Sequence, residues 1–158
     1  MKGKKFVAMD FSKEMIDMAR RKLIYRDDAD FAVADGKEMP FRDRKFDAVL
    51  LVAVLHSMYG SEHTAILKEL NRVMKPGAEL LVTVWNKRQP RFFLKGRESF
   101  IEWKLGERVM QRYYYLFTKK EMKQLLEKNG FQVISIVGST KKSFGFSSDI
   151  IAIARKRC

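Results

Sequence analysis

Residues 46–58, FDAVLLVAVLHSM, carry the strongest signal for the fold. Apolar side chains fill this run almost without a break, which is typical of a parallel strand whose two faces are both covered by helices. We therefore predict that this strand lies at the centre of a sheet. From Ser61 onward the spacing of apolar residues is helical, and the Lys-Pro-Gly sequence at 75–77 ends that helix. A further strand, ELLVTVW, follows at 79–85.

Upstream of this segment, a helix lies between two short predicted strands. Residues 6–11 predict the first strand and residues 30–35 the second. Ser12 is a good N-cap for the helix between them, which carries apolar side chains on one face as far as Leu23. Pro40 follows the second strand and excludes a regular helix interior there.

Downstream, the chain returns to a helix and two strands. Thr118 and Glu121 form a T-x-x-E capping box that opens the helix, and Gly130 ends it. The last two strands, at 131–137 and 149–154, are arranged as a closing antiparallel hairpin would be. Strands that alternate with helices predict a layered α/β fold whose sheet is mostly parallel.

The composition is that of one folded domain. With 158 residues and 46% apolar content, the chain can bury a sizeable core, so we predict a single domain over 1–158 with an insertion at 86–117. No apolar run approaches the roughly 20 residues that span a bilayer, so we expect no membrane partner and a cytoplasmic location. The one cysteine, Cys158, predicts an inert thiol and no cysteine metal site.

Two of the predicted strands end in an acid, Asp10 and Asp35. In parallel α/β sheets, ligands bind beyond the carboxyl ends of the strands. An ionised carboxylate only accepts hydrogen bonds, so one acid could take both hydroxyls of a ribose and the other an exocyclic amine. The alternative is that each acid merely caps a turn, as Asp often does at strand ends.

The order of these pieces resembles class I S-adenosylmethionine-dependent methyltransferases, from Phe6 to the end of the chain. VAMDFSKEMIDMAR at 7–20 resembles the family's second strand, and residues 31–58 resemble its third and fourth strands. LKELNRVMKPGAELLVTVW at 67–85 resembles the next helix, turn and fifth strand, and residues 131–156 resemble its final hairpin. The resemblance implies a Rossmann-like sheet and S-adenosylmethionine (SAM) as cofactor.

The same resemblance implies which residues bind SAM. Asp10 matches the acid that binds the ribose, and Asp35 matches the acid of the adenine pocket. Neighbouring positions complete the implied cofactor site, namely Phe11, Ala34, Gly36, Val52 and Ala53. For Gly36, close approach of the backbone or a turn is the expected role.

A narrower resemblance is to the tRNA wobble-uridine methyltransferases that esterify 5-carboxymethyluridine. It rests on a V-W-x-x-x-Q strand end at 84–89, on FIEWK at 100–104 and on R-Y-Y-x-L-F at 112–117. This resemblance implies tRNA as a partner, and a small zinc-binding activator protein that covers an apolar surface. That family commonly has two adjacent histidines where this chain has His56 and Ser57.

The insertion independently indicates nucleic acid. The chain has 32 Lys/Arg against 19 Asp/Glu, a net charge of +13, and ten Lys or Arg against three Glu lie between Lys87 and Lys120. Aromatic residues are interleaved with these charges. Single-stranded RNA is held by phosphate contacts and by stacking of bases on aromatic rings, so this mixture suits RNA. The alternative is a lid whose aromatic residues are core and whose charges are solvated.

A carboxylate acceptor of the methyl group is already ionised near neutral pH, so no strong general base is needed. Catalysis would rest on positioning, and His56, Arg91 and Arg112 are the candidate residues for steering the carboxylate. His56 has an alternative role as a hydrogen-bonded residue beneath the cofactor. His63 begins a helix that we expect to be exposed, so we predict that it lies on the surface.

The family's glycine-rich G-x-G-x-G loop follows its first strand, and these 158 residues contain no such motif. We expect a truncated form that lacks the first strand, loop and helix, exposes apolar strand edges and binds the cofactor poorly. Two other functions stay open. One is methylation of a small molecule on the same fold, and the other is a non-catalytic remnant that binds RNA or a partner.

Overall fold

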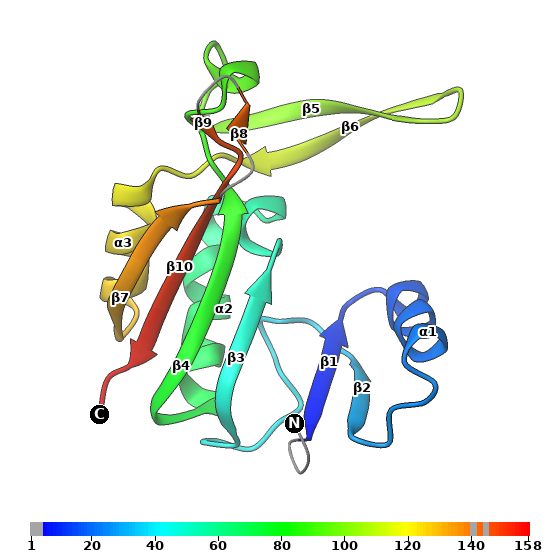
Figure 1. Cartoon of the computed structure of the whole chain (residues 1–158), viewed down its shortest axis with the longest axis vertical. Coiled ribbons are helices and arrows are strands. Elements are labelled where there is room, and N and C mark those ends of the chain that lie inside the picture. Colours follow the sequence, from blue (N-terminus) through cyan, green and yellow to red (C-terminus); the bar gives the residue numbers. More distant parts are fainter. Residues whose placement is uncertain (1–4, 140–141, 144–145) are drawn as a thin grey trace. The chain divides into compact units, whose positions relative to one another are not determined.

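The computed structural model describes residues 5–139, 142–143 and 146–158 (Figure 1). The chain forms two compact units, Met1–Phe41 and Arg42–Cys158. Each unit has its own sheet, and the ends of its strands place the candidate site residues.

The first unit is a β-α-β motif. β1 (Phe6–Asp10) and β2 (Ala29–Val33) pair in parallel. α1 (Lys13–Lys22) connects them, and it begins where predicted because the Ser12 hydroxyl accepts a hydrogen bond from the Met15 N–H at 3.2 Å.

The second unit is built on a four-stranded mixed sheet with the order β3-β4-β10-β7. β3 (Phe46–Val52) runs parallel to β4 (Met74–Trp85). β10 (Asp149–Lys156) is antiparallel to both β4 and β7 (Phe131–Gly138). The predicted antiparallel pairing of the last two long strands is therefore confirmed.

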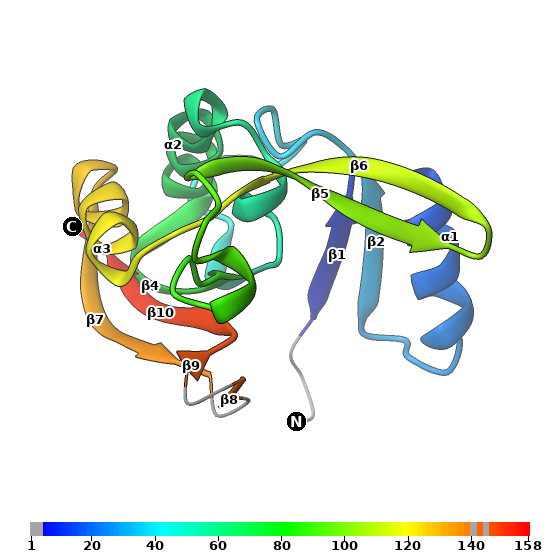
Figure 2. The same ribbon diagram turned by 90° about the horizontal axis from the view of Figure 1, so that it is seen from above.

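Two helices cover one face of this sheet, α2 (His63–Val73) and α3 (Lys119–Lys128), as Figure 2 shows. α3 opens with the predicted capping box, in which Glu121 Oε2 accepts from the Thr118 N–H at 2.8 Å and the Glu121 N–H donates to Thr118 Oγ1 at 3.3 Å. The apolar side chains between helices and sheet are fully buried and include Ile66, Leu67, Leu70, Leu80, Val82, Val84, Met122, Leu126, Ile150 and Ala152.

Two expectations about residues 46–58 are wrong. β3 lies at the edge of its four-stranded sheet and not at the centre. Helices do not cover both of its faces, since Leu50 is 71% exposed and Val52 is 56% exposed. An apolar run indicates that its side chains can be buried, but it does not indicate which other element would cover them.

The insertion contains a β-hairpin. After a 3-10 turn, η3 (Pro90–Phe92), β5 (Glu98–Leu105) and β6 (Arg108–Tyr115) pair in antiparallel fashion. Gly106, with φ of 61°, is the first residue of the two-residue connection, where the backbone requires glycine. The hairpin projects from the end of the sheet at which β4 ends (Figure 1).

Short elements complete the second unit. Two 3-10 turns, η1 (Leu55–Ser57) and η2 (Gly60–Glu62), join β3 to α2. β8 (Lys142–Ser143) and β9 (Phe146–Ser147) lie in the polar segment before β10, which is partly outside the described residues. In the described ranges, no helix has the length and apolar character needed to cross a membrane.

Candidate functional site

The carboxyl ends of β1 and β2 bring Asp10 and Asp35 to one edge of the first unit's sheet. The N–H of Ala34 donates to the Asp10 carbonyl at 3.1 Å, so the two strand ends adjoin. Asp10 Oδ1 accepts from the Ser12 N–H at 2.8 Å, and Asp35 Oδ1 accepts from the Lys37 N–H at 2.9 Å. Each acid therefore caps a turn, which is the alternative considered above. Asp10 keeps a second carboxylate oxygen, whereas Asp35 Oδ2 lies 3.5 Å from Lys37 Nζ.

These residues fit the adenosine part of SAM. The second oxygen of Asp10 can accept a hydrogen bond from a ribose hydroxyl. Phe11 follows it directly and is 82% exposed, so its ring is open to an apolar contact. Gly36 lies in the turn after Asp35, one of its two expected roles. The assignment of Asp10, Phe11, Ala34, Asp35 and Gly36 to the cofactor stays a prediction with which the geometry agrees.

In the second unit, an aromatic stack surrounds Trp85, the last residue of β4. The His56 ring lies 5.1 Å from the Trp85 ring at an interplanar angle of 14°, and the Tyr114 ring lies 4.2 Å away at the same angle. The guanidinium carbon of Arg91 is 4.6 Å from the centroid of the Trp85 ring and 4.5 Å from that of Phe92. The structure thus brings the candidates His56 and Arg91 together on Trp85.

His56 is a neutral, buried imidazole. Its side chain is 5% exposed, and its Nδ1 has no hydrogen-bond partner within the described part of the chain. Burial lowers its pKa from 6.5 to about 4, so the ring carries no charge at neutral pH. His56 can therefore orient a ligand through one hydrogen bond, whereas Arg91 brings a positive charge to the same Trp85 ring.

Gln89 holds Arg91 in this position. The buried Gln89 side chain donates through Nε2 to the Ser148 carbonyl and accepts from Arg91 Nε at 2.9 Å. The Asn86 N–H donates to the same Ser148 carbonyl at 3.1 Å. The V-W-x-x-x-Q pattern served above only as a family signature. In the structure its Trp85 is the centre of the stack, and its Gln89 holds Arg91.

The other candidates of this unit lie outside the stack. Arg112, on β6, has its guanidinium carbon 5.2 Å from the ring centroid of Trp103, and no ring contact with His56 is present. Val52 is the last residue of β3, and Ala53 follows it. Ala53 has a left-handed backbone with φ of 59°, held by its N–H donating to Thr83 Oγ1 at 3.0 Å. Their assignment to the cofactor also stays a prediction.

The prediction that His63 lies on the surface is wrong. Its side chain is 2% exposed, and its Nε2 lies 2.8 Å from the Leu55 carbonyl oxygen and 3.3 Å from that of Met58. Its ring meets the edge of Tyr115 at 4.8 Å. The turn η1 and the residue that follows it supply these carbonyls, and burial lowers the pKa of the imidazole.

Among the residues that the structure describes, no group of three or more His, Cys, Asp or Glu side chains could hold a metal ion.

The fold is that of class I SAM-dependent methyltransferases. A SAM-dependent methyltransferase from Methanosarcina mazei aligns with a TM-score of 0.81 and 21% identity, over 99% of this chain and 84% of its own. The 1,6-didemethyltoxoflavin-N1-methyltransferase of Burkholderia thailandensis, solved with 1,6-didemethyltoxoflavin and S-adenosylhomocysteine, aligns with a TM-score of 0.70 and 17% identity, over 96% and 61%. At such identities the likeness shows the fold.

Residues 1–82 match the methyltransferase domain family, and the chain belongs to that family. A demethylmenaquinone methyltransferase of Clavibacter sepedonicus is 39% identical over 80 residues, which are 51% of this chain and 32% of that protein. A probable tRNA methyltransferase 9B of Mus musculus is 27% identical over 95 residues, which are 60% of this chain and 20% of that protein. The aligned part thus spans about a fifth to a third of these relatives.

Proposed function

We propose that the protein transfers the methyl group of SAM to tRNA and esterifies 5-carboxymethyluridine at the wobble position. Membership of the methyltransferase family supports the methyl transfer, and the similarity to probable tRNA methyltransferases supports the substrate class. The observation that carries the proposal is one side of the β5–β6 hairpin, on which Trp103, Arg112 and Tyr114 lie together.

Directly paired residues of an antiparallel hairpin share a face, and side chains alternate between faces along each strand. Ile101 pairs with Arg112 and Trp103 pairs with Met110, so these four share one side with Tyr114. We call this side the hairpin face. At its base Tyr114 is buried in the Trp85 stack, and farther out Trp103 is 40% exposed.

The hairpin face suits an unpaired base. The Arg112 guanidinium lies over the Trp103 ring and can bind a phosphate or carboxylate, and the ring offers a surface on which a base can stack. Arg112 and Tyr114 are two residues apart on β6, so a base next to Arg112 would lie about 7 Å along the strand from the buried stack. The face therefore leads from an exposed stacking platform to His56 and Arg91.

The proposed chemistry needs orientation more than acid or base groups. When bound, SAM supplies an electrophilic methyl group on a sulfonium ion. Arg91 and Arg112 would bind and orient the substrate carboxylate, which is ionised at neutral pH, and His56 would add a neutral hydrogen bond. In the first unit, Asp10 and Asp35 would accept hydrogen bonds from the ribose and the adenine amine. A zinc-binding activator protein stays a prediction.

A second candidate function is methylation of a small molecule. The 39% identity to a demethylmenaquinone methyltransferase favours it, because this identity exceeds that to the tRNA methyltransferases. In that case the hairpin face would be a lid over an apolar substrate.

Both candidates can be tested with SAM labelled in its methyl group, offered with bulk tRNA or with demethylmenaquinone. We expect label in tRNA that mild base releases as methanol, because a methyl ester is base-labile and an N-methyl group is not. Label on the quinone would select the second candidate. Absence of label from both acceptors would contradict both.

The hairpin face supplies matched variants for this assay. Arg112→Gln and Trp103→Ala remove the cation and the ring, and we expect each to lower transfer to tRNA at least tenfold. Lys104→Gln removes one charge from the opposite side of the same hairpin and should leave transfer within about twofold. Equal losses for Arg112→Gln and Lys104→Gln would show that the hairpin acts through net charge and not through this face.

A further inference from the structure

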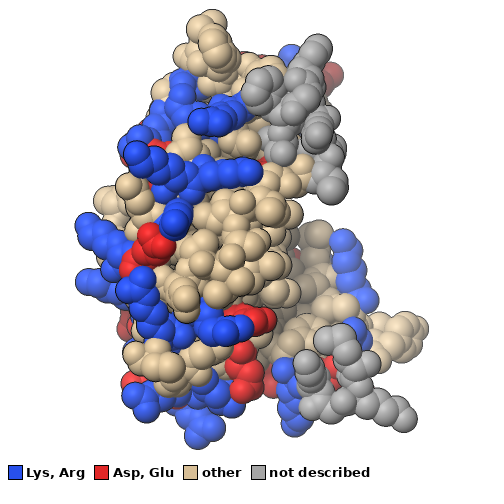
Figure 3. Space-filling model, turned by 60° about the vertical axis from the view of Figure 1, so that its left-hand side comes forward, with Lys and Arg blue, Asp and Glu red and all other residues tan. Residues whose placement is uncertain are grey.

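A second basic surface lies beside α3 and consists of residues outside the hairpin face. Figure 3 shows Lys and Arg side chains gathered along one side of the face in view, with few acids among them. We call the five Lys and Arg residues that line two hollows beside α3 the α3 strip, which consists of Lys87, Arg97, Lys119, Lys120 and Lys123.

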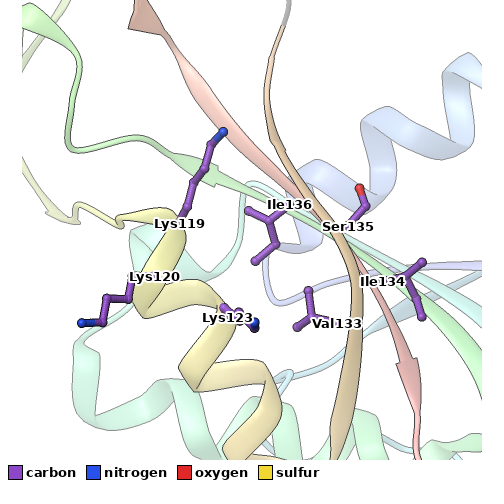
Figure 4. Close-up of a pocket in the computed structure, with 7 residues that line it drawn as sticks. All are labelled: Lys119, Lys120, Lys123, Val133, Ile134, Ser135 and Ile136. Atoms are coloured by element: carbon purple, nitrogen blue, oxygen red, sulfur yellow. The ribbon is translucent and has the colours of Figure 1, made fainter.

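Two adjoining hollows are lined by the α3 strip. The first lies between α3 and the edge strand β7, with Lys119, Lys120 and Lys123 on its helix side. Figure 4 shows Val133 and Ile136 pointing toward α3 and forming its floor. Besides Lys120, the second hollow is lined by Lys87, Arg97, Thr118, Glu121 and Gln124. Lys120 lines both hollows, so they adjoin at this residue.

Most of the positive charge on this surface is not neutralised by neighbouring acids. Glu121 pairs with Arg97 and also closes the capping box with Thr118. Lys123 lies 3.9 Å from Glu127, a distance at which an exposed pair is weak. For Lys87, Lys119 and Lys120, no ion pair is found within the described ranges.

We propose that the α3 strip binds the sugar-phosphate backbone of the same tRNA whose wobble base contacts the hairpin face. This inference rests on the proposed function, because it assigns a second contact to the same substrate. Lysines act as point charges that attract phosphates without requiring a defined ligand shape, and a row of them matches a repeating polyanion.

Continuity along the chain favours RNA over other anions. Arg97 belongs to the α3 strip and is followed directly by β5, so the strip begins where the hairpin begins. The floor of the first hollow is open and apolar, and it offers few hydrogen-bond donors to a small anion. The competing occupant is an acidic protein segment that pairs with the edge strand β7.

Salt dependence of RNA binding tests this proposal. The triple variant Lys119→Glu, Lys120→Glu, Lys123→Glu removes three cations from exposed positions of α3. The slope of log affinity against log salt is about −0.7 to −0.9 per phosphate neutralised, so we expect the slope for bulk tRNA to fall in magnitude by about 2 to 3. Anisotropy of labelled tRNA in about 50 to 200 mM KCl gives this slope.

The matched control reverses three exposed cations elsewhere in the second unit, Lys68, Lys128 and Arg157, with the same change in net charge. We expect its slope to change by less than about 1. Circular dichroism checks that both triple variants are folded. Equal slopes for the two triple variants would overturn the proposal, as would stronger competition for labelled tRNA by poly-glutamate than by unlabelled tRNA.

The outcome is independent of methyl transfer. If the slope falls as expected but no label reaches tRNA, the α3 strip binds RNA and the proposed reaction is wrong. If label reaches tRNA but the slope is unchanged, the reaction holds and the strip has no part in binding.

Discussion

Both histidines of the chain are buried, but among its described residues the structure gives a hydrogen-bond partner to the ring of His63 and none to Nδ1 of His56. His63 is buried against two backbone carbonyls, so its cost of burial is partly offset by a hydrogen bond. His56 is buried between aromatic rings with Nδ1 unpaired. A buried polar atom without a partner costs stability, and such atoms persist chiefly where a ligand or water completes them.

His56 should make stability depend on pH. Its pKa is about 4 in the folded chain and ordinarily 6.5, so between these values the unfolded state binds more protons. The free energy of unfolding should therefore fall as pH is lowered through this window, by at most about 3 kcal/mol. His56→Phe keeps a stacked ring without the titrating group, and urea unfolding at several pH values should show a flatter dependence.

His63 provides the comparison. His63→Phe leaves the carbonyls of Leu55 and Met58 without their imidazole contact, so it should lower stability near neutral pH, where the imidazole is uncharged. A pH dependence that His56→Phe leaves unchanged would contradict the neutral, buried state of His56.

At the scale of elements, caps and turns are the features that local sequence specifies. The Thr118 and Glu121 capping box is present as predicted, because its hydrogen bonds join residues three apart in the chain. Thr118→Ala removes the side-chain acceptor and should lower the free energy of unfolding by about 0.5 to 2 kcal/mol. Thr118→Ser keeps the hydroxyl and should cost much less. Thermal unfolding of the three proteins measures the difference, and equal losses for Ala and Ser would exclude capping as the cause.

The hairpin at 98–115 was harder to predict. Large aromatic residues occupy both of its sides, with Trp103 on one side and Phe100 and Tyr113 on the other, so no alternation of apolar and polar residues marks it as two strands. The candidate site could be predicted only in part. Asp10 and Asp35 could be found from strand ends, whereas the stack on Trp85 joins residues far apart in sequence, and only the folded chain brings Tyr114 to it.

At the scale of the whole molecule, the two units differ in how many apolar side chains each of them buries. Within the described residues of Met1–Phe41, the buried apolar side chains are Ile16 and Met39, whereas those of Arg42–Cys158 form the extensive core between helices and sheet. Local stability follows the density of buried apolar contacts. The first unit should therefore open far more often than the second.

Hydrogen exchange followed by mass spectrometry can measure this difference. We expect amides of β1 and β2 to exchange at least tenfold faster than those of β4 and β10, because few apolar side chains are buried in the unit that contains β1 and β2. Addition of S-adenosylhomocysteine should slow exchange in β1 and β2 if Asp10 and its neighbours bind the nucleoside, since a ligand stabilises the state that binds it. Equal protection of all four strands without ligand would contradict the expected difference.

The exposed aliphatic side chains on β3 also bear on how the protein behaves in a concentrated solution. Leu50 and Val52 belong to an edge strand, a combination that favours lateral pairing between molecules. A net charge of +13 opposes such encounters through mutual repulsion. That repulsion is screened over about 8 Å at physiological ionic strength and over less in stronger salt. Colloidal stability should thus rest on charge, and it should decline as the ionic strength rises.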